Sequence, residues 1–520
     1  MTELFVDEAD VIERVKRRFL DLTGIRNVEV YDEQVGLERF LRFAVGQDAP
    51  MYRRALAIID RELGPGSEFR GRLSLKVAHE KYTLESQESQ LLKSLISRSL
   101  RVTSDIAPGD VTVEFVPFRG GEEQTISEAA NHVILGRRGV GKSSLILLGV
   151  RKVSSAGDIP VWVDLQPYNR RDDPRCVAEV MQETLALAAR KAREAGNGGG
   201  SSLDSAISAL RRTANGKSVT GQDIRSALPP VRQWVREFTQ RARRQIFVFL
   251  DDAHMISQEL QPFLFDALHS ALKGVGGWLN IAGVKNLTRL YDSSRAIGLQ
   301  TPHDAQPVNL DLTLTDPGAA RDHLVAILEN FLSMCGIKRR LSIIPDRAIN
   351  RLVWCSAGVP RDFLWLFQTA MQHAIQNRRS RIAVQEVNLA LGEFGQLKMD
   401  ELAADAAEDS ALLNTFLQGL QARCLNEARS NSFLARRTPR RRGYELLQKL
   451  VDLRLVHLLH PSITPGRAGE HYEAYLLDYS FYTGIRRRHG LSELTIRSDS
   501  PPKYAELRSL PKIDVDALLD

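Results

Sequence analysis

The sequence predicts an α/β chain in which a parallel-sheet core is flanked by mostly helical segments. Two observations carry this prediction. Between about residues 106 and 315, short apolar runs typical of buried strands alternate with helical segments, which is the pattern of a parallel sheet with crossover helices. Within that region, the first apolar run leads directly into a glycine-rich turn and then into an apolar helix. The 520 residues are enough for roughly three or four domains.

The segment before the core, residues 1–105, has amphipathic patterns typical of helices at 10–22, 35–43, 51–63 and 86–100. A Gly-Pro-Gly turn at 64–66 interrupts them. No cluster of side chains there suggests chemistry, so we interpret the segment as a docking or regulatory domain.

The glycine-rich turn, residues 136–144, fits the pattern G-x-x-x-x-G-K-[ST], and the strand and helix around it separate a phosphate-binding loop from a chance match. Glycines let consecutive backbone N–H groups point at phosphate oxygens, and the helix adds its positive end. We expect Lys142 to reach the β- and γ-phosphates and Ser143 to hold Mg²⁺. The residues expected to bind ATP are Gly136, Gly139, Gly141, Lys142, Ser143 and Ser144.

Three further strands are expected at 159–165, 245–250 and 278–284, with helices at 203–213 and 229–243 before the third strand of the core. That third strand ends in Asp251 and Asp252, the pattern of a Walker B motif. Carboxylates at the carboxyl end of such a strand face the ligand crevice. We expect Asp251 to hold Mg²⁺ and Asp252 to polarise the attacking water.

After the core, helices are expected at 317–334, 346–355, 360–378 and 384–394. Another helix at 410–427 precedes an arginine run, a helix at 444–453, and a hairpin of 455–459 with 472–478. We therefore divide the chain into an N-terminal domain, a core, a helical lid, a winged-helix domain and an extended tail. Their predicted bounds are 1–105, 106–315, 316–394, 395–489 and 490–520.

Taken together, these motifs resemble the AAA+ ATPases, and within them the origin-recognition and cell-division-cycle initiator type. The fold class implied is an α/β P-loop NTPase core with a helical lid, a C-terminal winged helix and an extra N-terminal domain. In that family a polar residue after the fourth strand, here Asn286, orients the water, and an arginine in Gly-x-Pro-Arg, here Arg361, senses the γ-phosphate from the lid. The family has glutamate where this chain has Asp252, whose shorter reach could slow hydrolysis. Arg289 and Arg295 are both candidates for an arginine finger.

The arginine run is the strongest indication of a nucleic-acid partner. It places five arginines within seven residues, with no acid among them, just before a helix and a hairpin in the order of a winged helix. Arginine suits phosphate clamping, so we expect double-stranded DNA to bind there. Docking of an acidic protein and a solvated loop remain alternatives. The residues are Arg436, Arg437, Arg440, Arg441 and Arg442.

Composition excludes several other classes of protein. The net charge of +6 permits an acidic partner without requiring one. The four cysteines lie far apart, which argues against a zinc site or disulfide framework and fits a reducing cytoplasm. No apolar run approaches the ~20 residues of a membrane helix, and the acidic N-terminus does not resemble a signal peptide.

We therefore expect a cytoplasmic ATPase that uses ATP and Mg²⁺ and controls DNA binding and homo- or hetero-oligomeric assembly through its nucleotide state. A protein partner is expected to use the N-terminal domain or the tail. Two alternatives remain. One is a signalling or defence switch related to the STAND ATPases, whose terminal domains bind a protein effector. The other is an accessory that loads a transposition or repair enzyme.

Overall fold

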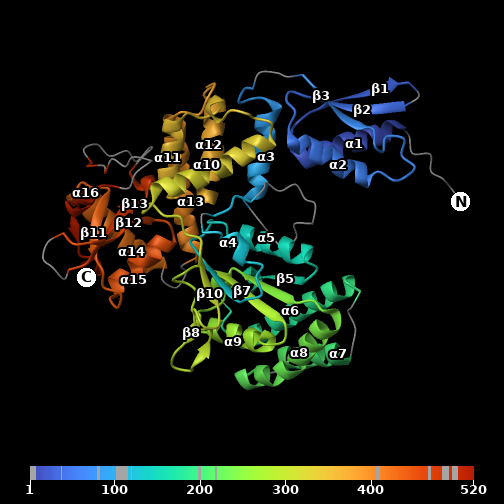
Figure 1. The fold of residues 1–520 in the computed structure, drawn as a ribbon. Coiled ribbons are helices and arrows are strands. Elements are labelled where there is room, and N and C mark those ends of the chain that lie inside the picture. The colour runs from blue at the N-terminus through green and yellow to red at the C-terminus, as the bar shows by residue number, and fades with distance from the viewer. Residues whose placement is uncertain are drawn as a thin grey trace. The chain divides into compact units, whose positions relative to one another are not determined.

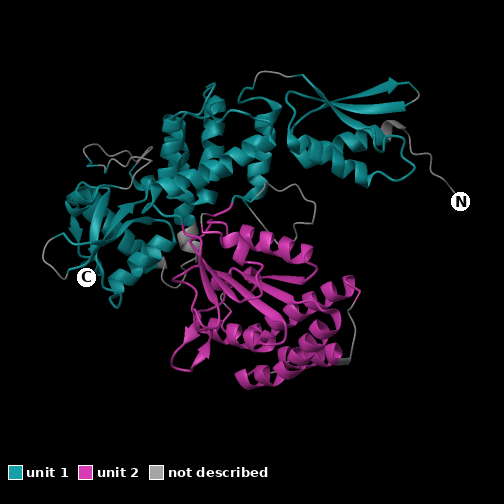
Figure 2. Ribbon diagram, in the orientation of Figure 1, with its two compact units in different colours: residues 1–101, 107–116, 312–520 teal, residues 102–106, 117–311 magenta. Residues whose placement is uncertain are grey.

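The chain forms two compact units, coloured separately in Figure 2. Unit 1 comprises residues 1–101, 107–116 and 312–520, and unit 2 comprises residues 102–106 and 117–311. The computed structural model describes residues 8–519 except for 37, 79–81, 101–114, 119, 170, 197–200, 217–218, 406–409, 466–469, 483–490, 493 and 495–501. Among the helices in this described part, none is both long and apolar enough to cross a bilayer.

Unit 2 contains a five-stranded parallel sheet with the spatial order β10-β4-β7-β6-β5. The inner strands are near-continuous apolar runs because helices cover both faces of a parallel sheet. Four of the five strands match the prediction, whereas the edge strand β10 was not predicted. The strands are β4 (His132–Leu135), β5 (Ile159–Asp164), β6 (Ile246–Asp251), β7 (Gly277–Gly283) and β10 (Gln306–Asn309).

Helices pack on both faces of this sheet (Figure 1). On one face, α4 (Glu122–Thr125) packs on α5 (Lys142–Ser155), and α5 packs on β6. A β-carbon on Gly149 of α5 would lie 3.1 Å from the Phe249 ring of β6, a tight contact. The opposite face, which includes Val248, packs against the larger set of helices. That set consists of α6 (Arg175–Glu194), α7 (Ser201–Ala214), α8 (Gly221–Ala242) and α9 (Gln261–Leu272).

The start of α8 differs from the prediction. The sequence analysis expected a helix at 229–243. The helix instead begins at Gly221, because Thr220 and Asp223 form a reciprocal capping box that satisfies the first backbone donors. Pro229 and Pro230 consequently lie inside the helix.

The N-terminal part of unit 1 combines helices with a three-stranded sheet of order β1-β2-β3. The segment 35–43, predicted to be helical, falls mostly in strand β2 instead. Its buried Leu41 and Phe43 alternate with less buried neighbours, and pairing on both sides fixes it as the central strand. The elements are α1 (Glu8–Thr23), β1 (Glu29–Val35), β2 (Glu38–Val45), α2 (Pro50–Glu62), β3 (Leu73–Val77) and α3 (Gln87–Ser99).

The lid consists of four helices, and the N-terminal domain packs on it through α3. Gln368 of the lid donates to Ser97 Oγ at 2.6 Å and to the Lys93 carbonyl at 3.3 Å. The last lid helix continues to residue 405, so one unbroken helix crosses the predicted domain boundary at 395. The helices are α10 (Pro317–Met334), α11 (Asp346–Ser356), α12 (Pro360–Gln376) and α13 (Val384–Asp405). The boundaries predicted at 105 and 489 lie outside the described residues.

The C-terminal domain follows the helix–strand–helix–hairpin order of a winged helix, with one departure. In residues 432–465, all of which the structure describes, a single helix stands between the first strand and the hairpin, where a helix-turn-helix would have two. The arginine run forms the turn before that helix. The elements are α14 (Ser410–Gln421), β11 (Ser432–Arg436), α15 (Arg442–Asp452), β12 (Val456–Ile463) and β13 (Tyr472–Leu477).

Residues 502–519, predicted as part of an extended tail, fold onto this domain. The short strand β14 (Lys512–Ile513) pairs in parallel with β11, and Val515 is buried. Asp516 Oδ1 then accepts a hydrogen bond of 3.0 Å from the Gly443 N–H in the first turn of α15. This carboxylate satisfies a donor that the helix itself leaves unpaired.

We predict that Gly443→Ala releases the C-terminal segment from α15. A β-carbon at this position would lie 2.5 Å from the Val515 carbonyl oxygen and 2.7 Å from Asp516 Oδ1. Hydrogen exchange of residues 512–519 should therefore become faster, although alanine is the better helix former by about 1 kcal/mol. Gly392→Ala is the control, since a β-carbon there meets nothing within 4 Å. Equal exchange in both variants would contradict the prediction.

Candidate nucleotide site

The candidate nucleotide site lies in unit 2, where β4, β6 and β7 reach the same edge of the sheet. Leu135 at the end of β4 pairs with Gly283 at the end of β7, and the Gly136 N–H donates to the Gly283 carbonyl at 3.4 Å. Asp251 ends β6 in register with Asp164 of β5. The sheet therefore brings the phosphate loop and the acidic pair together, as the sequence predicted.

The loop itself has the backbone that a phosphate cradle requires. Gly139 and Gly141 have φ values of 79° and 107°, a region that side chains disfavour. A β-carbon on Gly136 would lie 2.7 Å from Val140 Cγ2, so that position is also restricted to glycine. These three glycines were predicted to bind nucleotide. In the structure, backbone conformation or packing explains why each position requires glycine.

Lys142 and Ser143 begin α5 directly after the loop. The Lys142 ammonium is buried and donates to the carbonyls of Gly136 at 2.9 Å and Arg137 at 3.1 Å. Its charge is thereby held inside the curve of the loop, where a polyphosphate would meet it. Ser144 lies beside Ser143 in the same first turn and is half-buried.

The Ser143 hydroxyl lies close enough to the Asp251 carboxylate to lower its pKa, so the side chains of the two motifs interact. Burial, reinforced by the neighbouring Asp252 charge, raises the pKa of Asp251 to about 7. A buried carboxyl group beside a hydroxyl is a donor set that suits a hard divalent cation completed by phosphate and water oxygens. Ser143 and Asp251 therefore fit Mg²⁺.

Asp252 takes a left-handed backbone conformation, with φ of 52°, and its side chain is about one-third exposed. Beside it, His254 Nδ1 lies 3.9 Å from Asp252 Oδ1, and His254 Nε2 lies 3.3 Å from Arg138 Nη2. Burial, with the charges of Arg138 and Lys142, lowers the pKa of His254 well below its usual value. A neutral histidine thus contacts Arg138 of the phosphate loop and lies near Asp252 without a hydrogen bond to it, an arrangement that the sequence analysis did not identify.

A second unpredicted contact fixes the start of the loop. Asp311 accepts from the Arg137 N–H at 2.9 Å and from Arg137 Nε at 3.2 Å, and the arginine side chain is only 4% exposed. Asp311 follows β10, the edge strand that the sequence pattern did not reveal. The pair anchors the beginning of the phosphate loop to the strand next to β4.

Asn286 is exposed and lies three residues beyond the end of β7, with its carbonyl accepting from Gln258 Nε2 at 3.2 Å. The two arginine-finger candidates both pair with the buried Asp292. Arg289 Nη2 lies 3.0 Å and Arg295 Nε 3.8 Å from its carboxylate oxygens. Ion pairs with Asp292 therefore give both arginines a local structural role.

Arg361 belongs to unit 1, in the first turn of α12, and is exposed. The preceding Gly358 has φ of 80°, and a β-carbon there would lie 2.3 Å from the Leu312 carbonyl, so the sharp entry into α12 requires glycine. The next residue, Asp362, is buried and forms an ion pair with buried Arg454 of the C-terminal domain.

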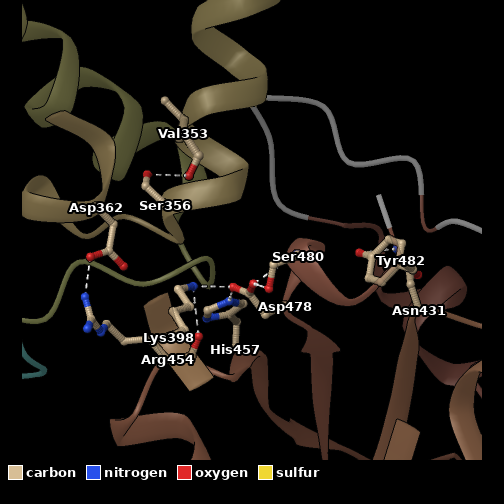
Figure 3. A network of polar contacts seen from close by, with 10 residues as sticks. All are labelled: Val353, Ser356, Asp362, Lys398, Asn431, Arg454, His457, Asp478, Ser480 and Tyr482. Atoms are coloured by element: carbon tan, nitrogen blue, oxygen red, sulfur yellow. Dashed lines mark hydrogen bonds and ion pairs between the residues drawn. The ribbon is translucent and has the colours of Figure 1, made fainter. Parts of the chain in front are cut away.

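Asp362 and Arg454 are part of a buried polar network within unit 1 (Figure 3). Lys398 Nζ of α13 lies 2.5 Å from Asp478 Oδ2 and donates to the Arg454 carbonyl at 3.1 Å. His457 Nε2 of β12 lies 2.8 Å from the same Asp478 oxygen. Burial alone would raise the pKa of Asp478, but the Lys398 and His457 interactions hold it below its usual value. The network joins the lid helices to the C-terminal domain.

We predict that Arg454→Met destabilises unit 1 by about 3–5 kcal/mol, because it leaves Asp362 buried without its counter-charge. The double variant Arg454→Met/Asp362→Leu should recover much of that loss, since both charges are then removed. Chemical unfolding of the two variants measures the difference. A single variant as stable as the wild type would contradict the role of the pair.

In the predicted DNA-binding run, three of the five arginines already have carboxylate neighbours. Arg437 Nε lies 3.7 Å from Glu473, Arg441 Nη1 4.0 Å from Asp516, and Arg442 Nη1 3.5 Å from Glu445. For Arg436 and Arg440 the described residues supply no such partner. The helix after the run turns its apolar side chains inward, among them Leu446, Leu447 and Leu450.

Comparison with known proteins gives a result for the fold only. No family model and no curated protein matches the chain. Among solved structures, it is similar to a Walker-type ATPase of Pyrococcus abyssi, with 13% identity, a TM-score of 0.44, and coverage of 72% of this chain and 96% of that one. It is also similar to the Aeropyrum pernix Orc1 protein in complex with DNA, with 14% identity, a TM-score of 0.38, and coverage of 72% and 92%.

A third similar structure is the Drosophila origin recognition complex bound to DNA, with 14% identity, a TM-score of 0.36, and coverage of 82% and 97%. The chain's own sheet order, phosphate loop and acidic strand end define an α/β P-loop NTPase core, which is followed by a helical lid. The predicted α/β P-loop core with a helical lid is confirmed by this sheet order and by the lid helices.

We predict that Lys142→Ala weakens ATP binding by about 10- to 100-fold, because charge-assisted hydrogen bonds contribute roughly 1.5–3 kcal/mol. Titration calorimetry with ATP and Mg²⁺ measures the effect. Lys273→Ala removes an exposed lysine from the same unit and is the control. Unchanged affinity in the Lys142 variant would place the nucleotide elsewhere.

Proposed function

We propose that this protein is an AAA+ molecular switch that binds and hydrolyses Mg·ATP and uses its nucleotide state to control double-stranded DNA binding, assembly and recruitment of partners. The observation that carries the proposal is the side-chain contact between Ser143 and Asp251 beside the Lys142 ammonium. Groups from two motifs more than 100 residues apart thus converge where a magnesium–phosphate unit would bind.

In this mechanism the loop N–H groups and Lys142 hold the phosphates, while Ser143 and Asp251 would hold Mg²⁺. The ion, when bound, neutralises charge that develops on the phosphate oxygens. Asp252 polarises the attacking water and Asn286 orients it. Neutral His254 packs beside Asp252 and contacts Arg138, and it adds no charge to the site. Arg361 reports the γ-phosphate to the lid.

DNA binding is assigned to the arginine run of the C-terminal domain. Arg436 and Arg440 have exposed side chains free for phosphate, whereas the other three would exchange carboxylates for phosphates. The buried network between lid and C-terminal domain supports transmission of the nucleotide state to this surface. The protein would act in the cytoplasm, in homo- or hetero-oligomers.

A signalling switch whose terminal domains bind protein is the second candidate. One observation favours it: the N-terminal domain is seated on the lid through α3, where Lys93 Nζ also donates to Gln372 at 3.3 Å. A partner bound to that domain would act directly on the helices that carry Arg361.

We predict that binding of a short DNA duplex requires Mg·ATP and the arginine run. Replacement of Arg436, Arg437, Arg440, Arg441 and Arg442 by alanine should weaken binding and reduce its salt dependence, because each lost phosphate contact lowers the slope by about 0.9. Fluorescence anisotropy across a salt series measures both quantities. The Lys142→Ala variant tests the nucleotide requirement.

Duplex binding that is indifferent to nucleotide would contradict the switch. Binding that survives loss of all five arginines would remove the run from the DNA surface. If the wild type binds no duplex in low salt while its ATP affinity is intact, the protein-facing switch becomes the better assignment.

A further inference from the structure

The segment that includes α7 and α8 of unit 2 has a net positive charge as large as that of the whole chain. Residues 201–244 contain eight arginines and one lysine against three acids, a net charge of +6. The whole chain also has a net charge of +6, so the rest is neutral overall. Figure 1 shows α7, α8 and α9, all of which belong to unit 2. The nucleotide site described above does not use the arginines of these helices.

Four of these arginines lie on one face of α8. They are Arg225, Arg232, Arg236 and Arg243, the last being the C-cap residue, and we call them the α8 stripe. At about 100° per residue, the spacing of seven, four and seven residues keeps all four within about 20° of one line, and the stripe extends roughly 27 Å along the axis.

The stripe has no acidic neighbours on its own helix. Asp223 caps the N-terminus with Thr220, and Glu237, which lies about 120° from the line, accepts from Ser202 and Gln233. Arg225, Arg236 and Arg243 are exposed, and across the described residues no carboxylate lies within ion-pair distance of them. This contrasts with the arginine run, where three of five are paired.

Structural roles explain only part of the stripe. Arg232 is half-buried and its Nη1 donates to the Ser270 carbonyl of α9 at 2.7 Å. A cation at Arg243 is favoured by the carboxyl end of the helix dipole. Neither reason applies to Arg225, in the second turn of α8, or to Arg236 in its middle.

The face also lacks what other partners would need. Its exposed positions between the arginines are Pro229 and Gln240, while the aromatic residues of α8, Trp234 and Phe238, are buried. A protein interface would be expected to centre on exposed aromatic or apolar anchors, and single-stranded nucleic acid on exposed rings for stacking. A linear row of arginines instead complements a row of phosphates.

We propose that the α8 stripe binds the sugar–phosphate backbone of double-stranded DNA, as a second contact separate from the arginine run. Its length corresponds to about eight base pairs at 3.4 Å per step. This inference rests on the proposed DNA-binding function and extends it to unit 2. Contacts of this kind fix position on the duplex without reading its sequence.

The experiment compares two triple variants of the full chain. Arg225→Ala/Arg236→Ala/Arg243→Ala removes the exposed stripe and leaves Arg232 to bind Ser270. Arg190→Ala/Lys191→Ala/Arg193→Ala removes three exposed cations from α6 and is the charge-matched control. Anisotropy with a 25-base-pair duplex is measured from about 50 to 200 mM salt, where phosphate contacts dominate the salt dependence. ATP affinity verifies that each variant is folded.

We expect the stripe variant to bind the duplex about tenfold or more weakly, with a salt slope reduced by up to about 2.7, and the control to stay near wild type. If the stripe and control variants have the same duplex affinity and the same salt slope, the proposal is overturned, whether or not the stripe binds a protein. In that case, weakened binding by the five-arginine variant would still uphold the arginine run. A wild type that binds no duplex overturns both contacts, while its ATP affinity still tests the nucleotide site.

Discussion

The nucleotide site depends on one constraint, the burial of a carboxyl group at the end of β6. Burial disfavours ionisation of Asp251, and the Ser143 hydroxyl, the Asp252 N–H at 2.9 Å and the Lys142 charge partly compensate for it. The surrounding contacts make this arrangement rigid: Arg137 is tied to Asp311, and Lys142 is held by loop carbonyls. These contacts hold the Asp251 carboxyl, the Ser143 hydroxyl and the Lys142 ammonium in place for a ligand. Such preorganisation lowers the entropy cost of binding.

A comparable constraint organises unit 1. Asp362, Arg454, Lys398 and Asp478 are buried ions whose separation from water is tolerated only because each faces a counter-charge. Such networks contribute little net stability compared with apolar packing, but they penalise any arrangement that separates the partners. The C-terminal domain is therefore specified in one position on the lid helices, next to the residue expected to sense nucleotide.

Much of the core was predictable because its signals are local. The phosphate loop, the acidic strand end and four strands follow from short windows of sequence. The features that were predicted wrongly or missed depend on contacts between residues that are distant in the chain. The segment 35–43 has an apolar pattern compatible with a helix until β1 and β3 pair with it, and β10 is too short and polar to stand out. The stripe was missed because arginines spaced by seven and four residues form no run, unlike residues 436–442. Asp516 and Asp311 act on partners 73 and 174 residues away.

The continuity of α13 has a mechanical consequence. Its 22 residues form a rod about 33 Å long that belongs to the lid at one end and reaches the C-terminal domain at the other. A loop at residue 395 would act as a flexible joint and dissipate small displacements, whereas a helix transmits bending and rotation along its length. Stiffness, rather than a hinge, thus characterises the link from the lid to the arginine run, and a change of a few degrees at one end becomes a displacement of ångströms at the other.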